Sequence, residues 1–191
     1  FFNFDFFLLT SARRWHVFLV ISTKEFYMNA TTALAGGLAG AATITILHES
    51  IRKVVPEAPR MDRLGMQAIS KGLKKAGKEV PDEGTLFTIT MAGDLISNAL
   101  YYSIAGIGSE KNIWVRSSVL GLTAGLGAVL LPKPLGLNKK HSNKTVATQL
   151  MTVGLYVTGA LVTTAVIKLL NKKKQVKNNE WERRLVTSAM G

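Results

Sequence analysis

The residue best placed to do chemistry is Asp94, the one charged residue in the otherwise uncharged run 85–107. A carboxylate at the centre of a membrane helix costs about 2.5–3.5 kcal/mol on insertion scales, and such residues usually mark an ion pathway or a paired interior site. Helical spacing puts Thr90, Asn98 and Tyr101 on the same face as Asp94. This polar stripe predicts either a proton or cation site with Asp94 as the titrating group, or a set of interhelical hydrogen bonds that fixes the packing.

A second polar stripe lies in the uncharged run 146–167. Its members are Gln149, Thr152, Tyr156 and Thr163. In the simplest arrangement the two stripes face each other inside a helical bundle. Hydrogen bonds between membrane helices average about 0.6 kcal/mol in measured cases, so the two stripes also suit a purely structural role.

Other candidates for catalysis or metal binding are weaker. His48 and Glu49 are adjacent on a predicted helix and therefore do not face each other. We interpret His48 as an anchor at the helix C-terminus and Glu49 as a partner for Lys53 at i+4. His141 lies among lysines without a ligand set, and the chain has no Cys, no phosphate-binding loop and no HExxH motif. We expect no metal site, no cofactor and no enzymatic activity.

The elements that position Asp94 can be predicted from uncharged length. A helix needs about 20 apolar residues to cross the hydrocarbon layer. The chain offers four such runs, at 28–47, 85–107, 114–131 and 146–167. A soluble bundle would need a wide charged face on each helix, and none of these runs has one. The sequence predicts an all-α integral membrane protein, a four-helix transmembrane bundle.

Composition divides the chain into three parts. Seven of the 8 Phe but none of the 17 Gly lie in residues 1–27, and the first Met is Met28. We interpret 1–27 as a non-native or upstream-translated extension, with a targeting segment or an interfacial aromatic segment as alternatives. Residues 28–170 form the predicted four-span domain. Residues 171–191 are a basic polar tail that we expect to be frayed or to lie at the membrane interface.

A basic segment follows the first span. Within 51–84, apolar residues recur at helical spacing from Met61 to Ala76, with lysines on the other side: Lys71, Lys74, Lys75 and Lys78. This pattern predicts a short interfacial amphipathic helix whose lysines face anionic headgroups. The alternative is a solvated helix packed on the end of the bundle.

The net charge of +12 lies mainly in the connecting segments and the tail. Topology and anionic lipid explain this distribution better than nucleic acid does. The chain is therefore expected to meet the lipid bilayer and no nucleic acid. The positive-inside rule favours the loops after spans one and three on the cytoplasmic side, although the lysine-rich tail argues for the opposite orientation.

Two GxxxG patterns occur in the predicted spans, at Gly36 and Gly40 and at Gly121 and Gly125. In membranes this spacing favours close helix contact. The two patterns predict contact between spans one and three, or association with another copy or another membrane protein.

The stretches LHESIRKVVPEAPRMDRLGMQAI (47–69) and AGDLISNALYYSIAG (92–106) resemble small multi-pass membrane proteins of unknown function from bacteria of the Bacteroidetes type. The resemblance covers roughly 28–170 and implies a location in the bacterial inner membrane. It implies no activity. The leading functional hypothesis is a non-enzymatic structural role or a role as a subunit of a larger assembly. The alternative is a small ion- or proton-coupled transporter or channel that uses Asp94.

Overall fold

The computed structural model describes residues 30–189, which are helical with short connections and contain no strand. The boundary at Met28 and the interpretation of 1–27 lie outside the described residues. The elements are a first helix Ala30–Ile51, α2 Met61–Lys75, α3 Glu83–Ser103, α4 Ile113–Leu130 and α5 Val146–Ala189, with 3₁₀ turns at Ile104–Gly106, Glu110–Asn112 and Lys139–His141. The all-α prediction is confirmed.

Three segments are long and apolar enough to cross a membrane: Ala30–Ile51, Glu110–Leu130 and Val146–Leu185. They correspond to three of the four predicted spans. At 21 residues, α3 is also of membrane length. It is not one of the three because Asp94 and several polar and small residues lower its hydropathy. The structure therefore supports a membrane protein with three spans by length and apolarity.

Local sequence fixes where the helices begin. Asp82 caps α3, and its carboxylate accepts a hydrogen bond from the Thr85 amide at 3.1 Å, as the acidic start of this segment predicts. At the start of α5, the Thr148 amide donates to Thr145 Oγ1 at 3.1 Å, and the Thr145 amide lies 3.3 Å from Thr148 Oγ1. This reciprocal pair resembles a capping box.

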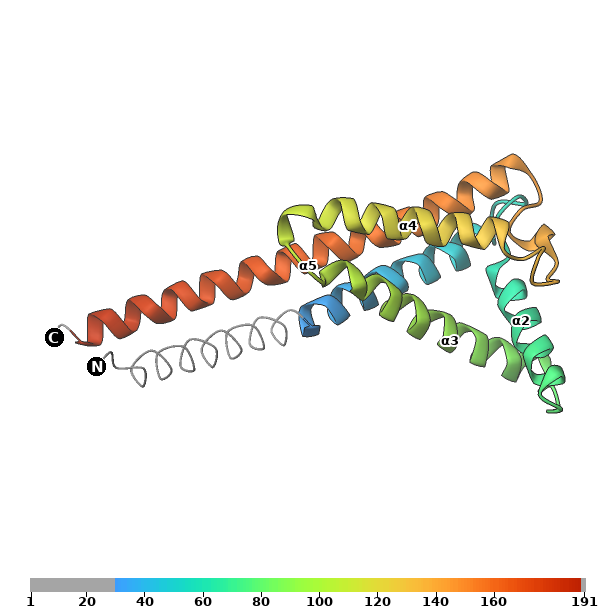
Figure 1. Ribbon diagram of the computed structural model, residues 1–191, viewed down its shortest axis with the longest axis horizontal. Helices are drawn as coiled ribbons and strands as arrows, with labels where there is room; N and C mark the ends of the chain where they lie inside the picture. Colours follow the sequence, from blue (N-terminus) through green and yellow to red (C-terminus); the bar gives the residue numbers. More distant parts are fainter. Residues whose placement is uncertain (1–29, 190–191) are drawn as a thin grey trace, which may run out of the picture.

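The long helices alternate in direction, and both basic connections lie at one end of the molecule (Figure 1). Several hydrogen bonds hold these connections together. The Arg60 amide donates to the His141 carbonyl at 2.7 Å, and the Asn138 amide donates to Gln67 Oε1 at 2.8 Å. The predicted helix after span one is present as α2. It bridges the end of the bundle and the beginning of α3.

Glycines set how closely the helices approach. A Cβ built on Gly40 would overlap Thr163 Oγ1 and the Gly159 carbonyl oxygen, both on α5. A Cβ on Gly121 or Gly125 would lie 2.8 or 2.7 Å from a Cα atom of α5. The predicted contact between spans one and three through these glycines is therefore wrong. Gly36, Gly40, Gly121 and Gly125 all approach α5, because α5 lies between the first helix and α4.

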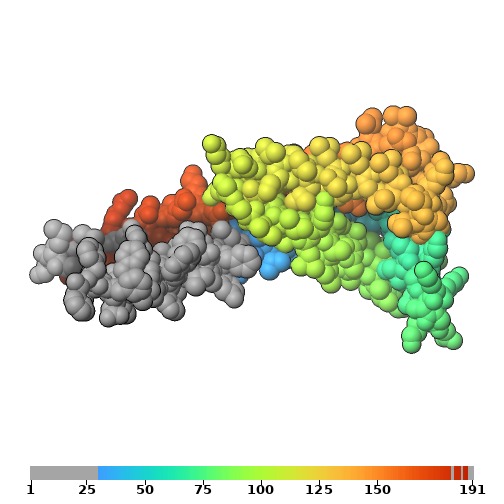
Figure 2. All heavy atoms as spheres, in the orientation of Figure 1, coloured from blue at the N-terminus to red at the C-terminus, as the bar shows by residue number. Residues whose placement is uncertain are grey.

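The buried core also centres on α5. Ile44, Tyr102, Tyr156 and Ala160 form one apolar cluster. Tyr102 is fully buried, and its hydroxyl donates to the Tyr156 carbonyl at 2.9 Å. This contact attaches the C-terminal end of α3 to α5. The N-terminal half of α3 leans away from α4 and α5 toward α2 (Figures 1 and 2).

The tail differs from its prediction. We expected the tail to be frayed or to lie at the membrane interface; fraying is not seen, because α5 continues as one helix of 44 residues to Ala189. Helix-forming residues without Gly or Pro run from 171 to 189, so nothing in the sequence ends the helix there.

Candidate functional site

A cavity of about 230 Å³, whose mostly apolar wall contains several polar side chains, lies where α3 leans away from the bundle. The first helix contributes Thr45, His48 and Glu49 to its wall, α2 covers one end, and α3 contributes Thr90, Asp94 and Ser97. Gly65 of α2 brings the two walls together, since a Cβ there would lie 2.5 Å from Thr90 Cγ2. The volume is enough for several water molecules.

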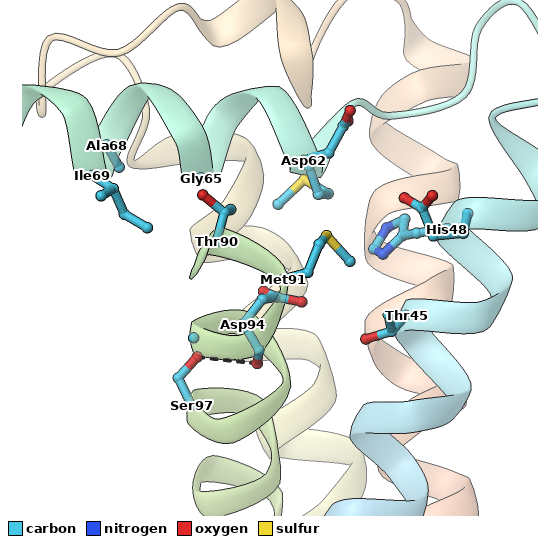
Figure 3. Close-up of a pocket in the computed structure, with 13 residues that line it drawn as sticks. Thr45, His48, Asp62, Gly65, Ala68, Ile69, Thr90, Met91, Asp94 and Ser97 are labelled. Atoms are coloured by element: carbon cyan, nitrogen blue, oxygen red, sulfur yellow. Dashed lines mark hydrogen bonds between the residues drawn. The ribbon is translucent and has the colours of Figure 1, made fainter. Parts of the chain in front are cut away.

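Unsatisfied polar atoms face this cavity. His48 is 7% exposed, and its Nε2 has no hydrogen-bond partner in the described part of the chain. The same holds for Thr45 Oγ1, one turn earlier on the same face. In Figure 3 both side chains point toward Asp94, which reaches into the cavity from α3. Buried polar groups without partners are rare in proteins, so these two atoms distinguish this wall of the cavity from the rest of the first helix.

Asp94 is held from one side only. Asn98 Nδ2 donates to Asp94 Oδ1 at 3.0 Å, one turn further along α3. Within residues 30–189, no cationic side chain forms an ion pair with Asp94. A half-buried carboxylate without a counter-charge is stabilised by binding a proton or a cation.

The other acidic side chains at the cavity are neutralised. Arg60 donates to both oxygens of Asp62, from Nε at 3.0 Å and from Nη2 at 2.7 Å. Arg52 pairs with Glu49 and, at 3.3 Å, with Asp62, and its guanidinium lies 6.0 Å from the centre of the Phe87 ring. Two carboxylates and two guanidinium groups balance at the α2 end of the cavity. Asp94 and His48 are therefore the ionisable groups there without a charged partner.

The ion network makes stability depend on pH through Asp62. Burial raises the pKa of the Asp62 carboxyl, but the Arg60 hydrogen bond and the charges of Arg60 and Arg52 outweigh it, so the net pKa is below its usual value. A lowered pKa in the folded protein stabilises it fully above the unfolded value, near pH 4, and this stabilisation is lost as the pH falls through the folded pKa. We expect the thermal unfolding temperature in mild detergent to drop below about pH 4.

The control for this titration is Asp62→Asn, which should be less stable at pH 6 and should lose less on acidification. Glu79→Gln removes an exposed carboxylate from the turn after α2 and should behave like the wild type. Parallel acid curves for wild type and Asp62→Asn would contradict a role for this network.

The predicted residues divide between two places. Thr90 and Asp94 line the cavity, and Asn98 bonds to Asp94. Tyr101 lies on the other side of α3, where its hydroxyl donates to the Leu120 carbonyl at 3.0 Å. Tyr156 is buried, and its ring meets the His48 ring edge-on at a centroid distance of 6.1 Å.

The expected facing of the two polar stripes is wrong for most of the second stripe. Gln149 bonds to Asn143 in the preceding loop. Thr152 donates to the Ser142 and Thr148 carbonyls, and Thr163 donates to its own helix at Gly159. Only Tyr156 meets α3, through Tyr102. Hydroxyls bonded within their own helix are satisfied locally, so they do not need a partner helix.

The predicted lysines of α2 are all exposed, as a headgroup-facing or solvated side requires. Lys71 also bonds within the protein, donating from Nζ to the Leu135 carbonyl at 2.7 Å. Glu49 pairs with Arg52 rather than with the expected Lys53. The Lys71 contact joins α2 to the connection between α4 and α5, in line with the alternative of a helix packed on the bundle end.

Sequence reasoning missed His48 and Thr45 as members of the site. We expected His48 to be an interfacial anchor, but it is buried against Tyr156. The available signal was the spacing of Thr45 and His48, which places a hydroxyl and an imidazole on one helix face at i and i+3. No group of three or more His, Cys, Asp or Glu in the described residues is arranged to hold a metal ion.

Comparisons of the chain with models of protein families, with curated proteins and with solved structures find no match. The geometry and chemistry of the cavity are therefore the basis for a functional proposal.

Proposed function

We propose that this chain is a non-enzymatic, four-span membrane protein that conducts protons through the Asp94 cavity, as a small transporter or channel. The single observation that carries the proposal is the position of Asp94. Within the described residues it is an ionisable group without a counter-charge, and it lines the same cavity as His48, whose Nε2 has no hydrogen-bond partner there.

A proton is the ion that this pair suits best. Carboxylates and imidazoles form proton relays in membrane proteins, because both can bind and release a proton. Divalent metal sites usually need three or more protein ligands, and the described residues offer no such group here. Thr45 and several water molecules would complete a hydrogen-bonded chain between Asp94 and His48.

The test is proton flux into vesicles. Purified full-length protein is reconstituted into liposomes that contain a pH-sensitive dye, the membrane potential is clamped with potassium and valinomycin, and a pH step is applied. We expect the wild type to dissipate the gradient at least about tenfold faster than Asp94→Asn, as for general acid–base groups in proton transfer. The amide keeps the shape and the contact with Asn98, but it cannot carry the proton.

Glu79→Gln is the matched control, because it removes one exposed carboxylate outside the cavity. It should conduct like the wild type. The proposal would be contradicted if wild-type vesicles dissipated the pH gradient no faster than protein-free vesicles. Equal rates for wild type and Asp94→Asn would also contradict it. Replacing external sodium with choline distinguishes proton conduction from sodium–proton exchange, since only exchange requires sodium.

We place the protein in the inner membrane of a bacterium, with the basic connections after the first helix and after α4 in the cytoplasm. The support is their position at one end of the molecule, since the positive-inside rule concerns lysine and arginine near the ends of spans. In this orientation the Asp94 cavity lies nearer the cytoplasmic end.

A second candidate is a subunit role in a larger membrane assembly. It is favoured by the extension of α5 beyond α4, which carries large exposed apolar side chains: Leu169, Val176, Trp181 and Leu185. Exposed apolar residues on an extended helix suit a partner protein. Unchanged flux in Asp94→Asn would favour this second role.

A further inference from the structure

A second hollow lies beside the Asp94 cavity and shares Met61 and Ser97 with it. It is an open groove of about 520 Å³ with a mostly apolar lining between α3 and α4. Small residues on α4 make room for it, namely Ala124, Gly127 and Ala128. Figure 2 shows the surface hollowed where α3 separates from α4 and meets α2.

Several polar groups in this groove already have partners inside the protein. The Tyr101 hydroxyl donates to the Leu120 carbonyl, and the Asn98 amide donates to Asp94. Most of the remaining lining is apolar, including Leu131 and Leu135, which are 55% and 58% exposed. A ligand that lies in the groove therefore needs a hydrocarbon portion.

The rim of the groove at the α2 end is basic. Lys71 lies there, with its Nζ on the carbonyl of Leu135, a residue that lines the groove. Lys133 is exposed between Pro132 and Leu135, which also line it. No carboxylate lines the groove. Hydrocarbon along the groove and negative charge at its basic end are the two parts of an anionic phospholipid.

We propose that the groove between α3 and α4 is a binding site for an anionic phospholipid, with an acyl chain along Ala124 and Gly127 and the headgroup phosphate at Lys71 and Lys133. Charge complementarity selects this occupant over a zwitterionic lipid. The two groups proposed to carry protons, Asp94 and His48, are not in its lining, so lipid binding and proton flux can be tested separately.

The groove can be filled by mutation without a clash. A Cβ on Gly127 would meet only Leu131 Cδ1, at 3.5 Å. In native mass spectrometry of the full chain in mild detergent, titrated with phosphatidylglycerol, we expect Gly127→Leu to weaken binding by about tenfold. Thr123→Phe, an exposed position at the groove edge, is a second variant that blocks the same space.

The control for volume is Gly154→Leu, because a Cβ on Gly154 of α5 has no atom within 4 Å. It should bind like the wild type. The contribution of charge is tested with the double variant Lys71→Gln and Lys133→Gln. We expect this pair to reduce the preference for phosphatidylglycerol over phosphatidylcholine of the same chains by about fivefold or more. Lys172→Gln with Lys173→Gln, exposed on α5, should leave that preference unchanged.

Equal lipid binding by wild type, Gly127→Leu and Thr123→Phe would overturn the proposal, because bound lipid would then be outside the groove. Equal preference for the two headgroups in the wild type would also overturn it. A dimer that Gly127→Leu dissociates would identify a second copy of the chain as the occupant and overturn the lipid assignment.

Discussion

Gly40→Val is expected to destabilise the protein by more than about 3 kcal/mol, because overpacking costs about 1–3 kcal/mol even where neighbours can move. Here one neighbour is the Gly159 carbonyl oxygen, which belongs to the backbone of α5. Gly37, three residues earlier, approaches the Ala99 carbonyl of α3 in the same way. The first helix is therefore held between two backbones and cannot shift away from one without striking the other.

The measurement is thermal unfolding in mild detergent, followed by circular dichroism. Gly154→Val is the matched control, since it makes the same substitution in a helix where nothing lies within 4 Å. It should be neutral or slightly stabilising, because Val has a higher helix propensity than Gly. Equal unfolding temperatures for the two variants would show that the close approach at Gly40 does not limit packing.

Asp94→Leu is expected to raise the stability of the folded protein by about 1.5–2.5 kcal/mol. Removing a carboxylate from a membrane helix returns about 2.5–3.5 kcal/mol on insertion scales, and losing the Asn98 hydrogen bond subtracts about 1 kcal/mol. The comparison is made from pH 5 to 8 in the same detergent. A gain in stability combined with a loss of proton flux is typical of a residue retained for function.

Asp94→Asn separates the cost of the buried charge from the contribution of the hydrogen bond with Asn98. It removes the charge and keeps a hydrogen-bonding group for Asn98, but the buried amide still has a desolvation cost, so its gain should be no larger than that of Asp94→Leu. If both variants are clearly less stable than the wild type, Asp94 is part of the packing, and the structural or subunit role becomes the better proposal.

The sequence alone was sufficient to predict the helices and the α3 side of the Asp94 cavity. Uncharged length located the helices that begin at Ala30, Ile113 and Val146, and apolar spacing predicted α2. Periodicity also placed Asp94, Thr90 and Asn98 on one face. These properties belong to a single helix, and a single helix can be recognised from local residues alone.

The pairing between helices could not be predicted in this way. Periodicity says which residues share a face, but it does not say which neighbour that face meets. The close approaches at Gly37 and Gly40 place the first helix between α3 and α5. As a result, Asp94 faces His48 rather than the polar stripe of α5. His48 itself ends an uncharged run, where an interfacial anchor and a buried site residue have the same sequence pattern.

The length of α5 determines how far the helix can extend beyond the membrane. Its 44 residues rise about 66 Å, whereas a bilayer with its headgroups is about 40–45 Å thick. If the helix enters the membrane at Val146, its last turns stand about 20 Å outside the headgroups on the far side. In that placement the end of α5 forms a stalk in the aqueous compartment opposite the basic loops, and a partner of Trp181 would bind away from the lipid surface.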